Sequence, residues 1–198
     1  YSESMERFGN DKPDLRFGLE LTTVTDIVKK SDFSVFKDVA AKGGIVKCIN
    51  PEKDIPRKEI DRYIEHCQKF GAKGMAWMRV SEEGLESNIA KFFSPEVQKE
   101  LIEAVGAKPG SVLMFIADKE KTCNDVISRL RLKLGEDLVL IYHEKFEFAW
   151  IVDFPLFEFN DDEEKWEPAH HMFTMPQAEC MQYLESDPSK VFASCYDM

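Results

Sequence analysis

Residues 56–80, PRKEIDRYIEHCQKFGAKGMAWMRV, predict a helix followed directly by a strand, and this alternation continues through the middle of the chain. Pro56 suits the first turn of a helix, where its missing N–H would have no partner in any case. Gly71 suits the position just after a helix. Between them, apolar side chains recur at the spacing of one helix face, at Ile60, Tyr63, Ile64, Cys67 and Phe70. Residues 75–80 then indicate a strand.

Similar patterns lie on both sides of this stretch. Ser94-Pro95 opens a helix that Gly106 ends, and a later helix with one apolar face ends at Gly135. Residues 21–28 predict a short helix with Thr22 or Thr23 as its N-cap. Strands are expected at 33–39, 45–49 and 112–117. The middle of the chain is therefore expected to contain about four strands and three or four helices.

The two ends of the chain have a different pattern of predicted elements from the middle. A helix-like stretch covers 2–8, and strands are expected at 148–159, 166–174 and 191–196, with a short helix at 177–184. The acidic residues 160–164 resemble the tip of a hairpin. The chain begins at Tyr1 inside the helix-like stretch and ends directly after a strand-like run. These two ends predict an excised fragment. The changes in sequence pattern along the chain predict internal domain boundaries near 16–20 and 138–146.

Composition narrows the functional classes. The chain has 198 residues, 43% of them hydrophobic, and a formal net charge of −11. This charge argues against a generic nucleic-acid coat, because non-specific binding depends on neutralising phosphates, although a local basic patch stays possible. The longest apolar run, 112–117, is too short to span a membrane. Five scattered cysteines without a CxxC pair favour a reducing, cytoplasmic location.

The adjacent pair His170-His171 is the strongest candidate in the sequence for a catalytic or binding site. Neighbouring side chains on a strand point to opposite faces, so the two imidazoles could not readily share one metal ion. One of them could face a site, or both could sit in an ordinary apolar setting beside Ala169, Met172 and Phe173. Neither of the glycine-rich phosphate-binding motifs, GxxxxGK[ST] or GxGxxG, is present.

Three other charged features each allow two interpretations. The acidic run 161–164 is either a solvated turn or a cation site, although it lacks the pattern of a calcium loop. The basic cluster Arg129, Arg131 and Lys133 either complements a helix dipole or contacts phosphate. Asp153 needs a partner if it is buried, so it is either hydrogen-bonded structurally or directed toward a site.

Four stretches, in this order and at this spacing, resemble the bacterial-type aspartyl-tRNA synthetases. They are RFGNDKPDLR at 7–16, GAKGMA at 71–76, LRLKLG at 130–135 followed by Asp137-Leu138, and WIVDFPLFE at 150–158 followed by His170-His171, Phe173-Thr174 and 196–198. The resemblance covers essentially the whole chain, and the combination is far more specific than any one motif. Met172 and Met175 depart from the family, which most often has Pro and often Ser at these positions; the departures concern the loop after the His pair.

The resemblance implies an α+β fold made of parts of two domains. Residues 20–140 would be the GAD-type insertion domain of the family, with a mainly antiparallel sheet and helices on one face. Residues 1–19 and 141–198 would be parts of the class II catalytic domain, which is built on an antiparallel sheet.

The resemblance also implies a function. The parent enzyme would be a homodimeric aspartate–tRNA ligase that activates L-aspartate with ATP and Mg²⁺ and transfers it to the 3′ end of tRNA. His170 would contact L-aspartate, and the chain would hold no catalytic residue, metal ligand or ATP-binding residue of the family. By itself the fragment is expected to be an inactive monomer without a bound cofactor and without membrane association. Two alternatives remain: an isolated insertion module that binds tRNA or protein, and a free-standing regulator.

Overall fold

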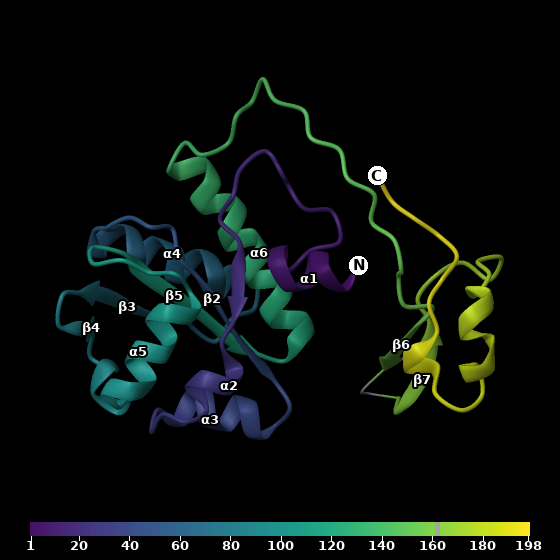
Figure 1. The fold of residues 1–198 in the computed structure, drawn as a ribbon, viewed down its shortest axis with the longest axis horizontal. Coiled ribbons are helices and arrows are strands. Elements are labelled where there is room, and N and C mark those ends of the chain that lie inside the picture. The colour runs from purple at the N-terminus through teal and green to yellow at the C-terminus, as the bar shows by residue number, and fades with distance from the viewer. Residues whose placement is uncertain (161–162) are drawn as a thin grey trace. The chain divides into compact units, whose positions relative to one another are not determined.

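The computed structural model describes residues 1–160 and 163–198 (Figure 1). The chain divides into two compact units. The large unit is Met5–Phe146, and the small unit comprises Tyr1–Ser4 and Glu147–Met198. The expected domain boundaries at 19/20 and 140/141 stay a prediction, because compact units are defined by contacts and sequence domains by family.

The large unit is built on a five-stranded sheet in the order β1-β2-β5-β3-β4, and every pairing between these strands is antiparallel. The central strand β5 pairs with β2 on one side and with β3 on the other, which brings Ile116 opposite Lys47 and Met114 opposite Trp77. The strands are β1 (Leu21–Thr23), β2 (Ile45–Ile49), β3 (Ala76–Ser81), β4 (Gly84–Glu86) and β5 (Val112–Asp118). The expected α+β class with a mainly antiparallel sheet is confirmed.

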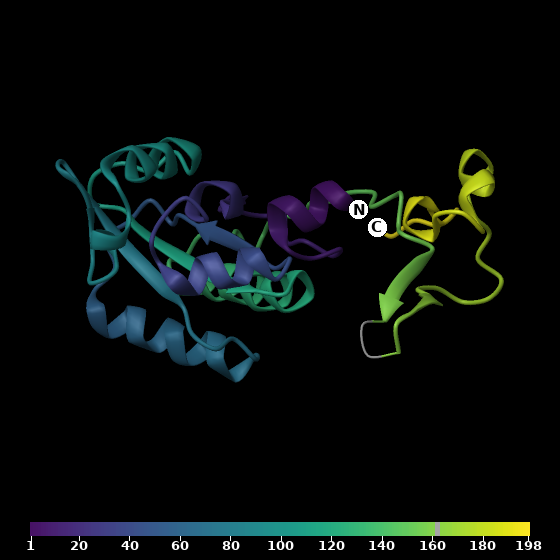
Figure 2. The same cartoon turned by 90° about the horizontal axis from the view of Figure 1, so that it is seen from below.

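Helices cover both faces of this sheet, so the prediction of helices on one face is wrong. In β5, Met114 and Ile116 pack with α4 (Arg57–Lys69) and α6 (Glu120–Asp137), whereas Leu113 and Phe115 pack in the opposite core. That second core includes residues of α2 (Thr25–Val28), α3 (Ser34–Ala41) and α5 (Pro95–Ala104). Figure 2 shows α4 and α5 on opposite sides of the strands. The physical reason is the continuous apolar run of β5, because a strand with apolar residues at successive positions is buried on both faces.

The helices at 56–70 and 94–106 and the strand at 112–117 are confirmed as α4, α5 and β5. Ser94 caps α5, since its Oγ accepts a hydrogen bond from the N–H of Val97 at 3.4 Å. The expected end of a helix at Gly135 is wrong, because α6 continues to Asp137. Gly135 is instead a position of close approach, where a Cβ atom would lie 2.7 Å from Cζ of Phe17.

Two expected elements near the start of the large unit are wrong. Residues 34–41 form helix α3 in place of a strand at 33–39. Residues 21–23 pair with β2 as strand β1, and the short helix α2 follows only at Thr25, with Val24 at its N-cap position and no side-chain cap. In both cases long-range contacts outweigh the local pattern, because residues 21–23 pair with β2 and Phe36 of α3 packs in the second core.

A buried lysine anchors the end of helix α1 (Ser2–Phe8). Lys47 on β2 has 2% of its side chain exposed, and its Nζ donates to the carbonyl oxygens of Met5 at 2.7 Å and Glu6 at 3.0 Å. Burial lowers the pKa of Lys47, and the nearby carboxylate of Glu6 opposes this shift. Gly9 then turns the chain with a φ of +67°, a conformation that favours glycine.

Replacing Lys47 by methionine should lower the free energy of unfolding of the large unit by about 2 kcal/mol, because two helix-terminal carbonyls lose a charged donor while the packed volume is nearly kept. Lys37→Met is the matched control, since Lys37 is exposed and forms a surface ion pair with Asp32; it should cost less than about 1 kcal/mol. Urea unfolding followed by circular dichroism measures both variants. Equal losses for the two would contradict the anchoring role of Lys47.

In its described residues the small unit contains one antiparallel pair of strands, β6 (Phe157–Asn160) and β7 (Lys165–Pro168), and two 3-10 helices, η2 (Ala178–Tyr183) and η3 (Pro188–Lys190). A third 3-10 helix, η1 (Ala90–Phe92), belongs to the large unit. The expected strands at 148–159 and 166–174 are therefore much shorter, and 191–196 makes isolated bridges instead of a strand. β6 and β7 flank the expected hairpin tip at 160–164, of which Asp161 and Asp162 lie outside the described residues.

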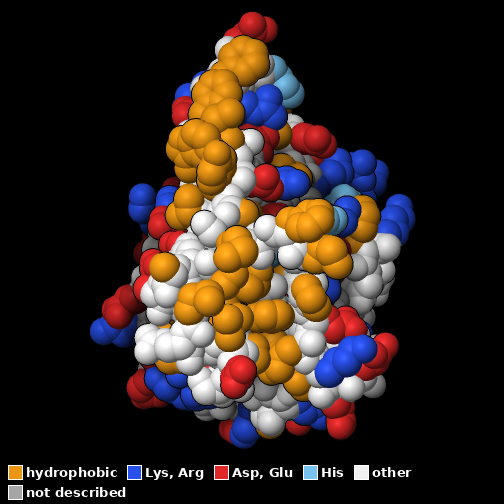
Figure 3. Space-filling view, turned by 90° about the vertical axis from the view of Figure 1, so that its right-hand side faces the viewer, with side chains coloured by type: hydrophobic (Ala, Val, Ile, Leu, Met, Phe, Trp, Pro, Cys, Tyr) orange, Lys and Arg blue, Asp and Glu red, His pale blue; other side chains and the backbone are white. Residues whose placement is uncertain are grey.

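The small unit exposes several large apolar side chains. Figure 3 shows hydrophobic side chains gathered on the face turned toward the viewer. The exposed ones of the small unit include Phe148, Trp150, Met172, Phe173, Met175, Tyr196 and Met198. An exposed apolar surface of this kind is typical of a contact with further protein. No helix in the described part of the chain has the length and apolar character needed to cross a membrane.

Candidate functional site

His170 lies in a bend just after β7, and not on a strand as predicted. β7 ends at Pro168, which pairs with Phe157, and the N–H of Ala169 still donates to the carbonyl of Leu156 at 2.9 Å. The chain then turns, and the N–H of Thr174 donates to the carbonyl of His171 at 2.8 Å. The argument that neighbouring side chains on a strand face opposite ways therefore does not apply to this pair.

The imidazole of His170 packs against a buried aromatic ring. It meets Phe154 edge to face, with the ring centroids 5.6 Å apart and the planes at 90°. The Nε2 atom of His170 is covered and has no hydrogen-bond partner among the described residues. Leaving such a group unpaired costs about 1–3 kcal/mol, and a ligand that bonded it would recover that cost. A ligand can reach this nitrogen only if the ring turns or the covering atoms move.

His171 has a different environment. It is exposed, its Nδ1 accepts a hydrogen bond from the N–H of Phe173 at 3.4 Å, and its ring lies 4.9 Å from that of Phe173. These contacts are local to the turn. The two histidines are thus unequal, and the reason is their packing. The assignment of His170 to L-aspartate stays a prediction.

Asp153 is held by a side-chain hydrogen bond in an unusual backbone conformation. Its φ is +57°, in the left-handed region that residues other than glycine rarely adopt. The Nε2 of Gln177 donates to its carboxylate at 2.8 Å and lies 3.3 Å from the carbonyl oxygen of Ala193. Asp153 is exposed and not buried, and of its two interpretations the structure supplies the structural hydrogen bond. Sequence reasoning missed Gln177, because no local pattern links positions 24 residues apart.

The basic cluster of α6 does not form a phosphate patch. Arg131 is buried, with 2% exposed, and its guanidinium donates to backbone carbonyls of Asp14, Phe17, Gly18 and Leu19. Arg129 pairs with Asp125 and lies over the ring of Phe70, and Lys133 pairs with Asp137. The position of Arg131 on the apolar face of α6, four residues after Ile127, could have indicated its burial.

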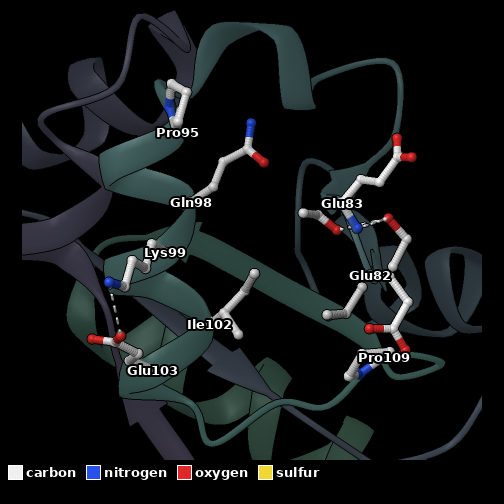
Figure 4. A pocket seen from close by; sticks show the side chains of 11 residues that line it. Glu82, Glu83, Pro95, Gln98, Lys99, Ile102, Glu103 and Pro109 are labelled. Carbon is white, nitrogen blue, oxygen red and sulfur yellow. Dashed lines mark hydrogen bonds and ion pairs between the residues drawn. The ribbon is translucent and has the colours of Figure 1, made fainter.

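An open groove of about 470 Å³ lies between the β3–β4 turn and α5 (Figure 4). Glu82 and Glu83 stand on one side, and Ile102 and Glu103 lie on α5, where Glu103 is 3.9 Å from Lys99. Gln98 faces the groove, but its amide is already bonded to the backbone of Leu85 and Phe93. Carboxylates on both sides disfavour a phosphate ligand. None of the residues expected to act on substrate lies here.

The described residues contain no group of three or more His, Cys, Asp and Glu side chains that could hold a metal ion. All five cysteines are free. Burial raises the pKa of Cys67 and of Cys123 to about 12, so both thiols are protonated and unreactive near neutral pH.

Comparison with known proteins identifies related sequences for both units. Residues 36–127 match the GAD domain. The whole chain is 47% identical to the aspartate–tRNA(Asp/Asn) ligase of Geotalea uraniireducens, 46% identical to that of Geobacillus sp., and 45% identical to the aspartate–tRNA ligase of Bacillus licheniformis. It covers 34% of each of these relatives, so the chain spans about a third of their length.

Proposed function

Since the chain carries a GAD domain and resembles the bacterial aspartyl-tRNA synthetases over its whole length, we propose that it is part of an aspartate–tRNA ligase. In this reaction a carboxylate oxygen of L-aspartate attacks the α-phosphorus of ATP, and pyrophosphate leaves. The 3′-terminal hydroxyl of tRNA then attacks the carbonyl of the aspartyl-adenylate, and AMP leaves.

The observation that carries this proposal is the extent of the similarity. The GAD match lies within the large unit, but the identity of about 45% continues through the small unit and the His pair. An accessory module that consisted only of the insertion domain has no need of the small unit. The extent of the match therefore favours the ligase over the isolated tRNA- or protein-binding module.

In this assignment, substrate binding is shared between this chain and the rest of the enzyme. His170 contacts L-aspartate, and ATP with Mg²⁺ is bound by parts that have no counterpart in these residues. The described basic side chains support this division, because Lys47 and Arg131 are buried on backbone carbonyls. The exposed apolar surface of the small unit is where those further parts pack. The complete enzyme would be a cytoplasmic homodimer, and the chain alone an inactive monomer.

The test is aminoacylation by the complete protein encoded by the gene. Purified protein, ATP, Mg²⁺ and tRNA should yield aspartyl-tRNA, whereas the isolated chain at the same concentration should yield none, because the phosphate-binding groups needed for adenylate formation are missing. A complete protein that binds tRNA but does not charge it with aspartate would favour the binding-module alternative.

A further inference from the structure

The backbone around Asp153 has little regular support. Residues 153–156 are linked to the end of the chain by isolated contacts: Ala193 N–H donates to the carbonyl of Phe154 at 2.7 Å, and Leu156 N–H donates to that of Val191 at 2.8 Å. The bridge Pro155↔Phe192 lies in the same segment. A continuous strand ladder would fix this segment without help from side chains.

The left-handed backbone conformation of Asp153 needs additional contacts to hold it. A residue with a Cβ atom is strained in this region, and Asp less than most, because its carboxylate can bond locally. The Nε2 of Gln177 donates to that carboxylate at 2.8 Å. Gln177 is itself fixed, because its backbone N–H donates to the carbonyl of Phe192 at 2.9 Å. The Asp153–Gln177 hydrogen bond thus joins two segments that strand pairing does not join.

The conformation of Asp153 affects His170 through the neighbouring residue Phe154. Phe154 follows Asp153 directly, so the φ and ψ of Asp153 set the direction in which Phe154 enters the core of the small unit. The Phe154 side chain is 6% exposed and meets the ring of His170 edge to face. If Asp153 relaxed to a negative φ, the Phe154 ring would move and His170 would lose the surface that orients it.

We propose that Gln177 is a positioning residue: through its hydrogen bond to Asp153 it holds the Phe154 ring in place and thereby orients the His170 imidazole for the amino-acid substrate. The part that concerns the substrate rests on the proposed function, and the part that concerns the ring orientation does not. Gln177 acts on the aspartate step without touching aspartate.

The experiment has two readouts. In the isotopically labelled chain, NMR measures the nuclear Overhauser contacts and ring-current shifts between His170 and Phe154. In the complete protein, KM and kcat are measured with aspartate and ATP varied separately. Gln177→Leu should weaken the His170–Phe154 contacts and lower kcat/KM for aspartate about 5- to 20-fold, with KM for ATP unchanged, which corresponds to about 1–2 kcal/mol.

Two further variants separate positioning from general damage. Gln182→Leu is the matched control, because Gln182 is exposed and its side-chain amide donates to the carbonyl of Glu179, three residues earlier; it should match the wild type in both readouts. Gln177→Glu should behave like Gln177→Leu, because two carboxylates then face each other. The double variant Asp153→Asn with Gln177→Glu restores a donor and an acceptor between the two side chains but leaves the Ala193 carbonyl without its donor, so it should recover both readouts in part.

The outcomes are decisive. Unchanged His170–Phe154 contacts in Gln177→Leu would overturn the proposal, and so would changed contacts with unchanged aspartate kinetics. If the complete protein shows no aspartate-dependent activity, the proposed function itself fails, and the NMR readout alone then decides whether Gln177 orients His170.

Discussion

Arg131→Ala should lower the free energy of unfolding of the large unit by about 3–5 kcal/mol, the largest loss expected from a single side chain in this chain. The guanidinium donates from Nε to the carbonyl of Leu19 at 2.9 Å and from one Nη to carbonyls in 14–18 at 2.8–3.1 Å. It also lies between the rings of Phe8 and Phe17, at 4.8 and 4.2 Å from their centroids. Alanine leaves these carbonyls without their charged donor and removes both cation–π contacts.

The charge of Arg131 persists at neutral pH. Burial lowers its pKa to about 10, with the carboxylates of Asp14 and Glu20 opposing the shift, so the guanidinium is still protonated at pH 7. Arg131→Lys should recover only part of the stability, because one ammonium group cannot reach the same set of carbonyls as a planar guanidinium.

Arg129→Ala is the matched control, two residues earlier on the same helix. Arg129 is about half exposed, at 45%, and pairs with Asp125 by one hydrogen bond. Its loss, including the contact with Phe70, should cost less than about 1 kcal/mol. Urea unfolding can be followed by the fluorescence of Trp77, the only tryptophan of the large unit, after Trp150 and Trp166 are replaced by phenylalanine. Similar losses for the two alanine variants would show that the buried carbonyls are satisfied without Arg131.

His170→Ala in the complete protein should lower kcat/KM for aspartate about 10- to 100-fold and leave the affinity for ATP nearly unchanged. One hydrogen bond to a charged group contributes about 1.5–3 kcal/mol, and each 1.36 kcal/mol is a factor of ten in rate. The Nε2 of His170 has no partner among the described residues, so a carboxylate that bonds it displaces no existing protein hydrogen bond.

His171→Ala is the control for this prediction. The ring of His171 is exposed, and its Nδ1 accepts a hydrogen bond from the N–H of Phe173 within the same turn. Removal of this side chain should therefore change the aspartate kinetics by less than about threefold. Steady-state kinetics with aspartate and ATP titrated separately measure both variants. An aspartate defect in His171→Ala with a normal His170→Ala would mean that the roles are assigned to the wrong ring.

The sequence predicted the elements whose apolar pattern is long and regular. Helix α4 has Ile60, Tyr63 and Cys67 buried on one face, and β5 is an unbroken apolar run, so both were evident. Helix α3 was mistaken for a strand because Phe33, Val35 and Val39 fall at even spacing, although Phe36 is the residue that it buries. Short segments with mixed spacing are decided by their partners, which a local pattern does not contain.

The site was predicted only in part. The resemblance singled out His170, but the geometric reason given for its difference from His171 required a strand that ends at Pro168. Phe154 and Gln177 meet His170 and Asp153 only after the small unit folds, across separations of 16 and 24 residues. Arg131 was visible as a cation on an apolar helix face, yet its carbonyl partners lie more than 100 positions away. Such long-range polar contacts leave no periodic signal.

The most direct test of the central claim, that these residues belong to an aspartate–tRNA ligase, is ATP–pyrophosphate exchange by the complete protein with each amino acid supplied alone. L-Aspartate should stimulate exchange at least a hundredfold above background, L-asparagine and L-glutamate should not, and His170→Ala should weaken the response to aspartate. Exchange that depends on a different amino acid, or a folded complete protein in which aspartate stimulates none, would contradict the account.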